Sequence, residues 1–159
     1  MIRPWMVIGG IALLLALLGG SIVRPKGVQW FRRLRRPEWL VFEPLIPFIW
    51  ILVLTGGVWS ATLVWEQAPH TSQTWGLMVG YILLELAILA YNPAMLVARD
   101  LRLGTIVGGV GFVIGLVLTW LVADVSSQAA WLLLPFLLWS PIGTYTTWAM
   151  LKLNPSQQN

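Results

Sequence analysis

Residues 103–123 read LGTIVGGVGFVIGLVLTWLVA, and this stretch decides the fold because it carries no charge and is as long as a membrane crossing requires. A helix of about 20 apolar residues spans the roughly 30 Å hydrocarbon core of a bilayer. Backbone groups that face lipid must be bonded within their own segment, and the run is too long and too continuous for a barrel strand. We therefore predict a transmembrane helix over residues 103–123.

The composition extends this interpretation to the whole chain. Of 159 residues, 58% are hydrophobic and only 10% are charged, whereas a soluble domain carries roughly a quarter of its residues as charges. Four further apolar stretches are long enough to cross a bilayer, namely residues 4–23, 45–65, 75–97 and 129–151. We predict an all-α membrane protein, a bundle of five transmembrane helices that forms a single domain over residues 1–159. The absence of cysteine excludes disulfides, thiolate metal sites and a cysteine nucleophile.

The basic residues predict the orientation. Six of the ten lie in one loop, residues 24–43, and they are Arg24, Lys26, Arg32, Arg33, Arg35 and Arg36. Because cytoplasmic loops are enriched in Lys and Arg, the N-terminus is expected outside and the C-terminus in the cytoplasm. The net charge of +4 is then a topology signal, and no nucleic-acid partner is expected.

The chain contains eleven tryptophans, and most of them lie near the predicted span ends, where membrane proteins enrich Trp. Trp50, Trp59 and Trp139 lie deeper. Two interpretations remain open for them: packing within the bundle, or the walls of a pocket for a flat apolar ligand. Helical spacing places Leu54 on the face of Trp50, and it places Phe136, Gly143 and Thr146 on the face of Trp139. Two such faces would enclose a cavity in the cytoplasmic half.

The loop at residues 24–43 alternates aromatic rings with charges, and it should lie at the level of the lipid headgroups. Two roles remain open for its arginines Arg32, Arg33, Arg35 and Arg36. They bind either anionic lipid or the carboxylates of an amphiphilic ligand, which a guanidinium binds through two parallel hydrogen bonds. Trp30 and Trp39 would anchor the loop, which favours a lid over the pocket.

Three other features allow two interpretations each. Gly104, Gly108, Gly111 and Gly115 form a small-residue stripe that suits either close packing inside the bundle or a homodimer seam. Glu85 is an acid within a span, which typically faces the bundle interior, and a proton relay would need partners that the sequence lacks. His70 is a solvated loop residue or a haem ligand. No catalytic triad, phosphate loop or metal-ligand spacing is present.

The chain resembles the tryptophan-rich sensory protein or translocator protein (TspO) family over nearly its whole length. The segments that carry the likeness are Trp30, residues 37–39, residues 49–50 and 57–59, residues 134–139, and residues 153–155. Phe136 stands where the family signature has Tyr, Leu54 replaces a pocket Tyr, Gly143 replaces an Ala and Thr146 replaces an Asn.

The resemblance implies a ligand-binding membrane protein for tetrapyrroles such as porphyrin or haem. Trp50 and Trp139 match two pocket tryptophans of the family. No cofactor is expected to be required; the expected partners are the tetrapyrrole, membrane lipids and a second copy in a homodimer. The expected location is a bacterial inner membrane or an organellar membrane. A sensor, carrier or scavenger is the first hypothesis, and a light-dependent porphyrin-degrading enzyme or a transporter of porphyrin or lipid is the alternative.

Overall fold

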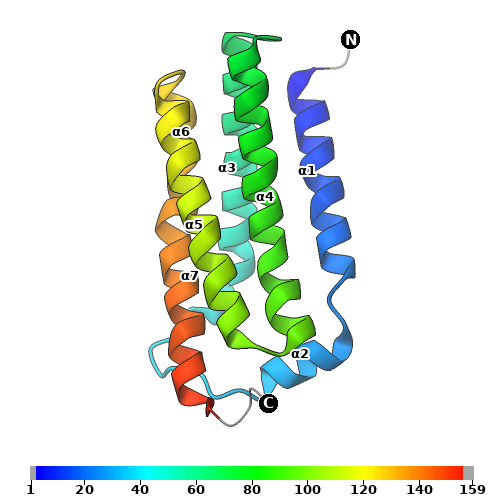
Figure 1. Ribbon diagram of the computed structural model, residues 1–159, viewed down its shortest axis with the longest axis vertical. Helices are drawn as coiled ribbons and strands as arrows, with labels where there is room; N and C mark the ends of the chain where they lie inside the picture. Colours follow the sequence, from blue (N-terminus) through cyan, green and yellow to red (C-terminus); the bar gives the residue numbers. More distant parts are fainter. Residues whose placement is uncertain (1–2, 156–159) are drawn as a thin grey trace.

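The computed structural model of the protein describes residues 3–155, and every regular element within that range is helical. The helices in chain order are α1 (Pro4–Ser21), α2 (Pro25–Arg32), the short 3-10 helix η1 (Glu43–Leu45), α3 (Ile46–Gln67), α4 (Ser72–Ala98), α5 (Leu101–Ala123), α6 (Ser127–Leu132) and α7 (Leu134–Leu153). The long helices run side by side, and the start of α1 and the end of α7 lie at opposite ends of the bundle (Figure 1). The predicted all-α class is confirmed.

Local sequence signals set the ends of these helices. Side-chain oxygens of Thr71, Asp100 and Ser126 accept hydrogen bonds from backbone N–H groups in the first turns of α4, α5 and α6, which would otherwise lack partners. Proline occupies the first turn of α1, α2, α3 and α7, where its missing N–H costs no helical hydrogen bond. Arg99 ends α4 in the left-handed conformation and donates its N–H to the Met95 carbonyl.

The predicted span over residues 129–151 consists of two helices, and Pro135, where the sequence predicts a kink, lies just after the break. The helix breaks at Leu133, which separates α6 from α7, and the backbone N–H of Leu133 bonds the Ala130 carbonyl instead of the Ala129 carbonyl. Pro135 explains the break because it has no N–H to donate into the preceding turn and restricts the residue before it. Ser60 of α3 donates to the Ala129 carbonyl that the break leaves open, at 2.7 Å.

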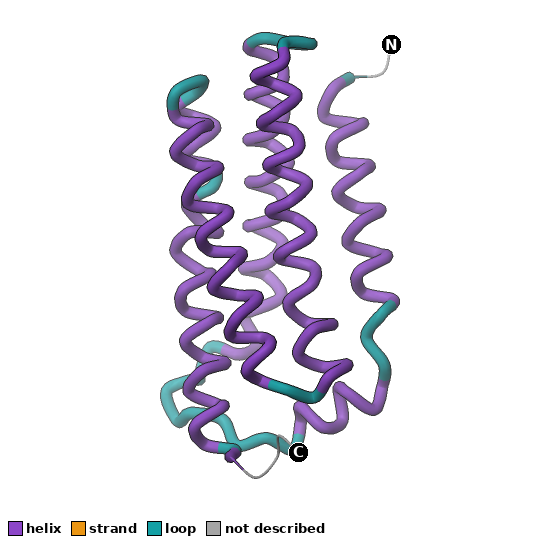
Figure 2. The backbone as a smooth tube through the Cα atoms, viewed as in Figure 1, coloured by secondary structure: helices purple, strands orange, loops and turns teal. Residues whose placement is uncertain are grey.

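The segment at residues 24–43 is more ordered than a loop. It contains α2, which begins at Pro25, and only the stretch between Arg33 and Phe42 is irregular (Figure 2). Gly27 of α2 lies against the Leu96 backbone of α4, so closely that a Cβ at this position would overlap the Leu96 carbonyl oxygen. This contact fixes α2 across the end of α4.

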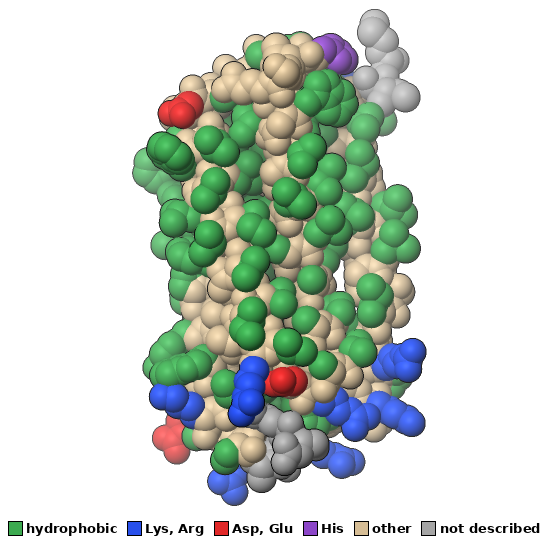
Figure 3. Space-filling model, viewed as in Figure 1, with side chains coloured by type: hydrophobic (Ala, Val, Ile, Leu, Met, Phe, Trp, Pro, Cys, Tyr) green, Lys and Arg blue, Asp and Glu red, His purple; other side chains and the backbone are tan. Residues whose placement is uncertain are grey.

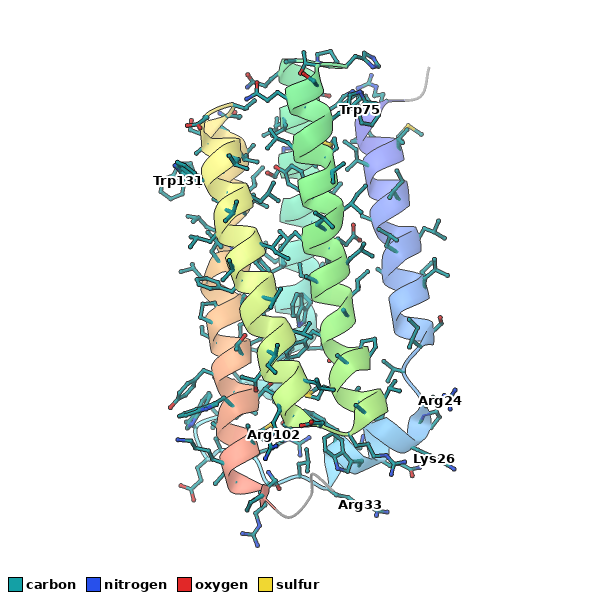
Figure 4. All side chains as sticks on the ribbon, in the orientation of Figure 1. Arg24, Lys26, Arg33, Trp75, Arg102 and Trp131 are labelled. Carbon is teal, nitrogen blue, oxygen red and sulfur yellow. The ribbon has the colours of Figure 1, made fainter. Side chains whose placement is uncertain are left out.

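The outer surface of the bundle is apolar, while Lys and Arg gather at one end (Figure 3). We call the end that carries α2 and the last turn of α7 the basic end, and the opposite one the far end; Figure 4 labels Arg24, Lys26, Arg33 and Arg102 at the first and Trp75 and Trp131 at the second. Leu17, Phe48 and Trp131 are all more than 60% exposed, as lipid-facing side chains should be.

Four segments are long and apolar enough to cross a membrane, and they are Pro4–Ser21, Glu43–Gln67, Ser72–Ala98 and Leu101–Ala123. The chain is therefore an integral, multi-pass membrane protein. α7 is not among the four, because its Ser, Thr and Tyr residues lower its hydropathy.

The glycine stripe of α5 faces the interior of the bundle. A Cβ added at Gly104 would lie 3.1 Å from Met95 Sδ of α4, and one at Gly108 would lie 2.5 Å from Thr144 Oγ1 of α7. A Cβ at Gly115 would overlap the Phe136 ring, whereas Gly111 meets only Ala87 at 3.6 Å. The stripe thus serves close packing of α5 against α4 and α7 within one protomer.

Candidate ligand-binding cavities

A cavity of about 390 Å³ lies between α3, α4, α5 and α7, in the half of the bundle nearer the basic end. We call it the basic-end cavity. It brings together five residues predicted from the sequence, namely Trp50, Phe136, Trp139, Gly143 and Thr146. A volume in this range is ordinary for a small-molecule site. The expectation that the faces of Trp50 and Trp139 enclose one cavity agrees with this geometry.

Helix placement explains the aromatic walls. Trp50 follows the proline-started first turn of α3 and is half-buried, while Trp139 on α7 is only 8% exposed. Gly143 lies one turn after Trp139, and a Cβ there would be 4.0 Å from the indole nitrogen, so the missing side chain leaves room beside the ring. Gly108 and Gly111 leave similar room on the α5 wall. The cavity therefore has ring walls and open glycine surfaces.

A polar strip on α7 adds hydrogen-bonding groups to these walls. The Tyr91 hydroxyl of α4 bonds the Thr147 hydroxyl and also lies 3.4 Å from the Gly143 carbonyl. Thr144 Oγ1 is buried and has no hydrogen-bond partner among residues 3–155. An unsatisfied buried hydroxyl is costly, so Thr144 is available to a polar atom of a ligand. The sequence analysis missed Tyr91 and Thr144, although Tyr91 begins the Tyr-Asn-Pro run in α4.

The mouth of the basic-end cavity carries one guanidinium. Arg36 lines the cavity, and its Nε lies 2.8 Å from a carboxylate oxygen of Glu43, which also lines it. The Arg36 guanidinium also lies 5.5 Å from the centre of the Phe31 ring. This cation is therefore positioned at the entrance by an ion pair and an aromatic face.

Two aromatic contacts with α7 and the hydrogen bonds of Asn154, the residue after α7, hold the irregular stretch before α3 in place. Trp39 stacks on Tyr145 with ring centres 5.7 Å apart, and Phe42 meets Trp139 edge-on at 6.0 Å. Asn154 accepts from the Arg35 N–H at 2.8 Å and donates to the Arg35 carbonyl at 2.9 Å. The segment thus covers the cavity as a fixed lid, which the sequence analysis expected from its aromatic residues.

Other predicted residues lie elsewhere. Arg32, Arg33 and Arg35 are exposed, and none of the three lines the cavity; Arg33 points away from the bundle in Figure 4. Trp30 packs in a small cluster at the basic end with Leu34, Met95, Leu96, Leu101 and Met150. Trp39 holds the lid from outside the cavity, and Leu54 lines a different cavity.

That second cavity, of about 520 Å³, lies between α1, α3 and α4 toward the far end. We call it the far cavity. Leu54, Gly57 and Ala61, which share a face with Trp50, line it rather than the basic-end cavity. Glu85 also lines it, and Phe136 and Ile88 line both cavities. These two side chains therefore form the wall that separates the two spaces.

The fold and the basic-end cavity together define a helical multi-pass membrane protein with an aromatic-walled ligand cavity under a basic lid. Residues 8–153 match the model of the TspO/MBR family, and the chain belongs to that family. It is also similar to the Tryptophan-rich protein TspO of Bacillus cereus, with 25% identity over 136 residues, which cover 84% of this chain and 86% of that protein. The resemblance inferred from the sequence motifs is confirmed.

Proposed function

We propose that the protein binds a tetrapyrrole, a porphyrin or haem, in the basic-end cavity and acts as a sensor, carrier or scavenger of that ligand. The observation that carries the proposal is the pairing of two indole walls, Trp50 and Trp139, with glycine surfaces and a single guanidinium at the mouth. Flat rings stack on indoles, and a propionate suits Arg36. In this proposal the tetrapyrrole is a reversibly bound ligand, and the protein needs no cofactor besides it.

The proposal includes five membrane crossings, with α6 and α7 together forming the fifth. The basic end then faces the cytoplasm and the N-terminus lies outside, since Lys and Arg concentrate at that end. Exposed Arg32, Arg33 and Arg35 would contact lipid headgroups. A homodimer is also part of the proposal. The α5 glycines are occupied within the protomer, so another helix face would have to form the dimer contact.

The tryptophan walls can be tested by titrating protoporphyrin IX into the full chain in lipid nanodiscs and following the Soret band. The double variant Trp50→Phe, Trp139→Phe should weaken binding by about tenfold, because each indole stack is worth about 0.5–1.5 kcal/mol beyond area. Trp59→Phe is the matched control, since Trp59 lies on α3 like Trp50 but is 56% exposed. Equal affinities of the double variant and the control would reject the pocket.

The guanidinium at the mouth can be tested with the dimethyl ester of the same porphyrin. Arg36→Lys keeps the charge but loses the bidentate geometry. It should therefore weaken binding of the diacid several-fold, about 1 kcal/mol, and leave the affinity for the ester unchanged. Arg33→Lys is the control because Arg33 is exposed and lies outside the cavity. If both variants bind diacid and ester like the wild type, the arginines serve lipid and topology alone.

A further inference from the structure

The far cavity holds one ionisable carboxyl in walls that are otherwise largely apolar. Glu85 lies at the middle of α4, and its Oε1 is buried with no hydrogen-bond partner among residues 3–155. No Lys or Arg from that range lines the cavity. A carboxyl at this depth is costly unless a donor or a cation meets it. Glu85 is therefore an acceptor without a protein partner.

The hydroxyl of Tyr81, which lines this cavity, is already engaged. Ser60 donates its hydroxyl proton to the Ala129 carbonyl at 2.7 Å, so the Tyr81 hydroxyl, 2.5 Å from Ser60 Oγ, donates to Ser60. The Tyr81 proton is thus used within the chain of hydrogen bonds that ends at the broken helix. A molecule that enters the cavity with an N–H or O–H group would supply the donor that Glu85 lacks among residues 3–155.

The far-end side of the cavity is aromatic. The Trp65 and Trp75 rings meet nearly at right angles with centres 5.0 Å apart, and the His70 ring lies edge-on to Trp65 at 5.2 Å. All three residues line the cavity. The rings therefore offer aromatic surface to the apolar part of a molecule in this cavity.

Two other occupants fit these groups less well. Glu85 lies thirteen residues after the start of α4, which at 1.5 Å per residue places it roughly 20 Å along the helix from the far end. A phospholipid would have to draw its charged headgroup to that depth. A tetrapyrrole would bring its own carboxylates toward Glu85, and like charges repel.

From these observations we propose that the far cavity is a second binding site, specific for a lipophilic monocation: an apolar or aromatic molecule that bears one protonated amine. The ammonium pairs with the Glu85 carboxylate, and the apolar body fills the space between α1, α3 and α4. α1 lines this cavity and buries none of its residues, and entry of the molecule from the lipid beside α1 is part of the proposal. This site is independent of the tetrapyrrole proposal.

The test uses a matched pair of probes, 4-(4-trifluoromethylphenyl)butylamine and the corresponding alcohol, with the full chain in phosphatidylcholine nanodiscs. Fluorine NMR of the probes reports binding, and empty nanodiscs correct for partition into lipid. The wild type should bind the amine at least about tenfold more tightly than the alcohol, because only the amine forms an ion pair. Glu85→Gln, which keeps size and hydrogen bonding, should remove this preference and change the alcohol affinity by less than about threefold.

A second pair of variants tests the location. Gly57 lines the far cavity, and a Cβ there meets nothing within 4 Å. Gly57→Leu should therefore place its side chain in the cavity without a clash at Cβ and weaken binding of both probes by about tenfold or more. Gly109 has equally open surroundings but lines neither cavity, so Gly109→Leu is its control. Far-UV circular dichroism and thermal unfolding of each variant verify that the bundle has folded.

Three results would overturn the proposal. Equal affinities of amine and alcohol for the wild type, or an amine affinity that is unchanged in Glu85→Gln, would show that the carboxyl does not recognise a cation. Loss of amine binding in Trp139→Phe with retention in Gly57→Leu would place the amine in the basic-end cavity. Failure of protoporphyrin to bind the wild type would reject the proposed function alone, because the amine measurement does not depend on it.

Discussion

The two cavities of this bundle differ in the charged groups that line them and in the depth of those groups. The basic-end cavity carries Arg36 at its mouth, beside the irregular lid and within an ion pair to Glu43. The far cavity carries Glu85 midway along α4, with a buried oxygen that lacks a partner in the described chain. The rest of the basic-end cavity combines aliphatic and aromatic side chains with the polar strip of Tyr91, Thr144 and Thr147, whereas the rest of the far cavity is largely aliphatic and aromatic.

The depth of a charge in an apolar bundle determines how strongly that charge contributes to ligand recognition. A charge near the headgroups is partly solvated and already paired, so it orients an anionic group without adding much affinity. A charge at mid-depth is poorly solvated, so it discriminates strongly between a partner and a neutral analogue. The first cavity should therefore recognise its ligand chiefly by ring stacking, and the second chiefly by charge.

Phe136 maintains the difference because it stands between the two spaces. Its ring is 4% exposed, lines both cavities and lies against Gly115 of α5, which has no side chain to displace it. Displacement of the Phe136 ring should therefore change the affinities of both cavities.

Gly115→Ala should have the largest effect on stability. The added methyl would overlap the Phe136 ring, and Leu84 on the other side, 3.4 Å from the new Cβ, limits the relief. Overpacking of this kind costs typically about 1–3 kcal/mol, and the displaced ring should change the affinities of both cavities together. Thermal unfolding in nanodiscs and titration with porphyrin and amine probes measure the two effects.

Gly109→Ala is the matched control for that variant. A Cβ at Gly109 meets nothing within 4 Å, so the substitution should be neutral or stabilising by up to about 1 kcal/mol through the lower entropy of the unfolded chain. Equal stabilities of the two variants would show that the Gly115 contact does not hold Phe136.

Asn154→Ala should have an intermediate effect, confined to the basic-end cavity. Asn154 is 4% exposed, bonds both the N–H and the carbonyl of Arg35, and donates to the Met150 carbonyl at 2.8 Å. Loss of these bonds should cost about 1–2 kcal/mol and release the lid. Hydrogen exchange at residues 33–42 should accelerate, while exchange in the α1 and α4 segments around the far cavity stays unchanged.

Asn154→Asp refines the measurement because it retains an oxygen for the Arg35 N–H but has no amide donor. We expect lid exchange between that of the wild type and that of the alanine variant. Protection of the lid in Asn154→Ala as strong as in the wild type would show that the aromatic contacts of Trp39 and Phe42 suffice.

Much of this arrangement could be predicted from the sequence because it depends on periodic, local signals. Apolar stretches of membrane-spanning length located α1, α3, α4 and α5, and helical spacing placed Trp50 with one wall and Trp139 with another. The gathering of basic residues at one end followed from the loop at residues 24–43.

The rest depends on contacts between residues far apart in the chain. The bonds of Asn154 to Arg35 span 119 positions, and no local pattern signals them. Leu54 was assigned to the Trp50 cavity because both share a helix face, yet the neighbouring helices divide that face between two cavities. The four lid arginines look equivalent in sequence. Of these four, only Arg36 contacts a carboxylate and an aromatic ring, and these contacts hold it at the basic-end cavity.

Glu43→Gln should have the smallest effect on stability and still sharpen the comparison. The Arg36–Glu43 pair is partly exposed, with side chains 29% and 41% accessible, so its loss should cost less than about 1 kcal/mol. Glutamine preserves size and can still accept from Arg36, but it no longer neutralises the guanidinium. If Glu43 competes with a ligand carboxylate for Arg36, the porphyrin diacid should bind a few-fold more tightly to the variant than to the wild type, whereas the diester should bind both equally. The gain in diacid affinity should shrink in high salt, because exposed charges are screened. Weaker diacid binding would instead show that Glu43 orients Arg36 toward the ligand. In that case the basic-end cavity relies on its charge as much as the far cavity does, and the contrast between stacking and charge recognition would not hold.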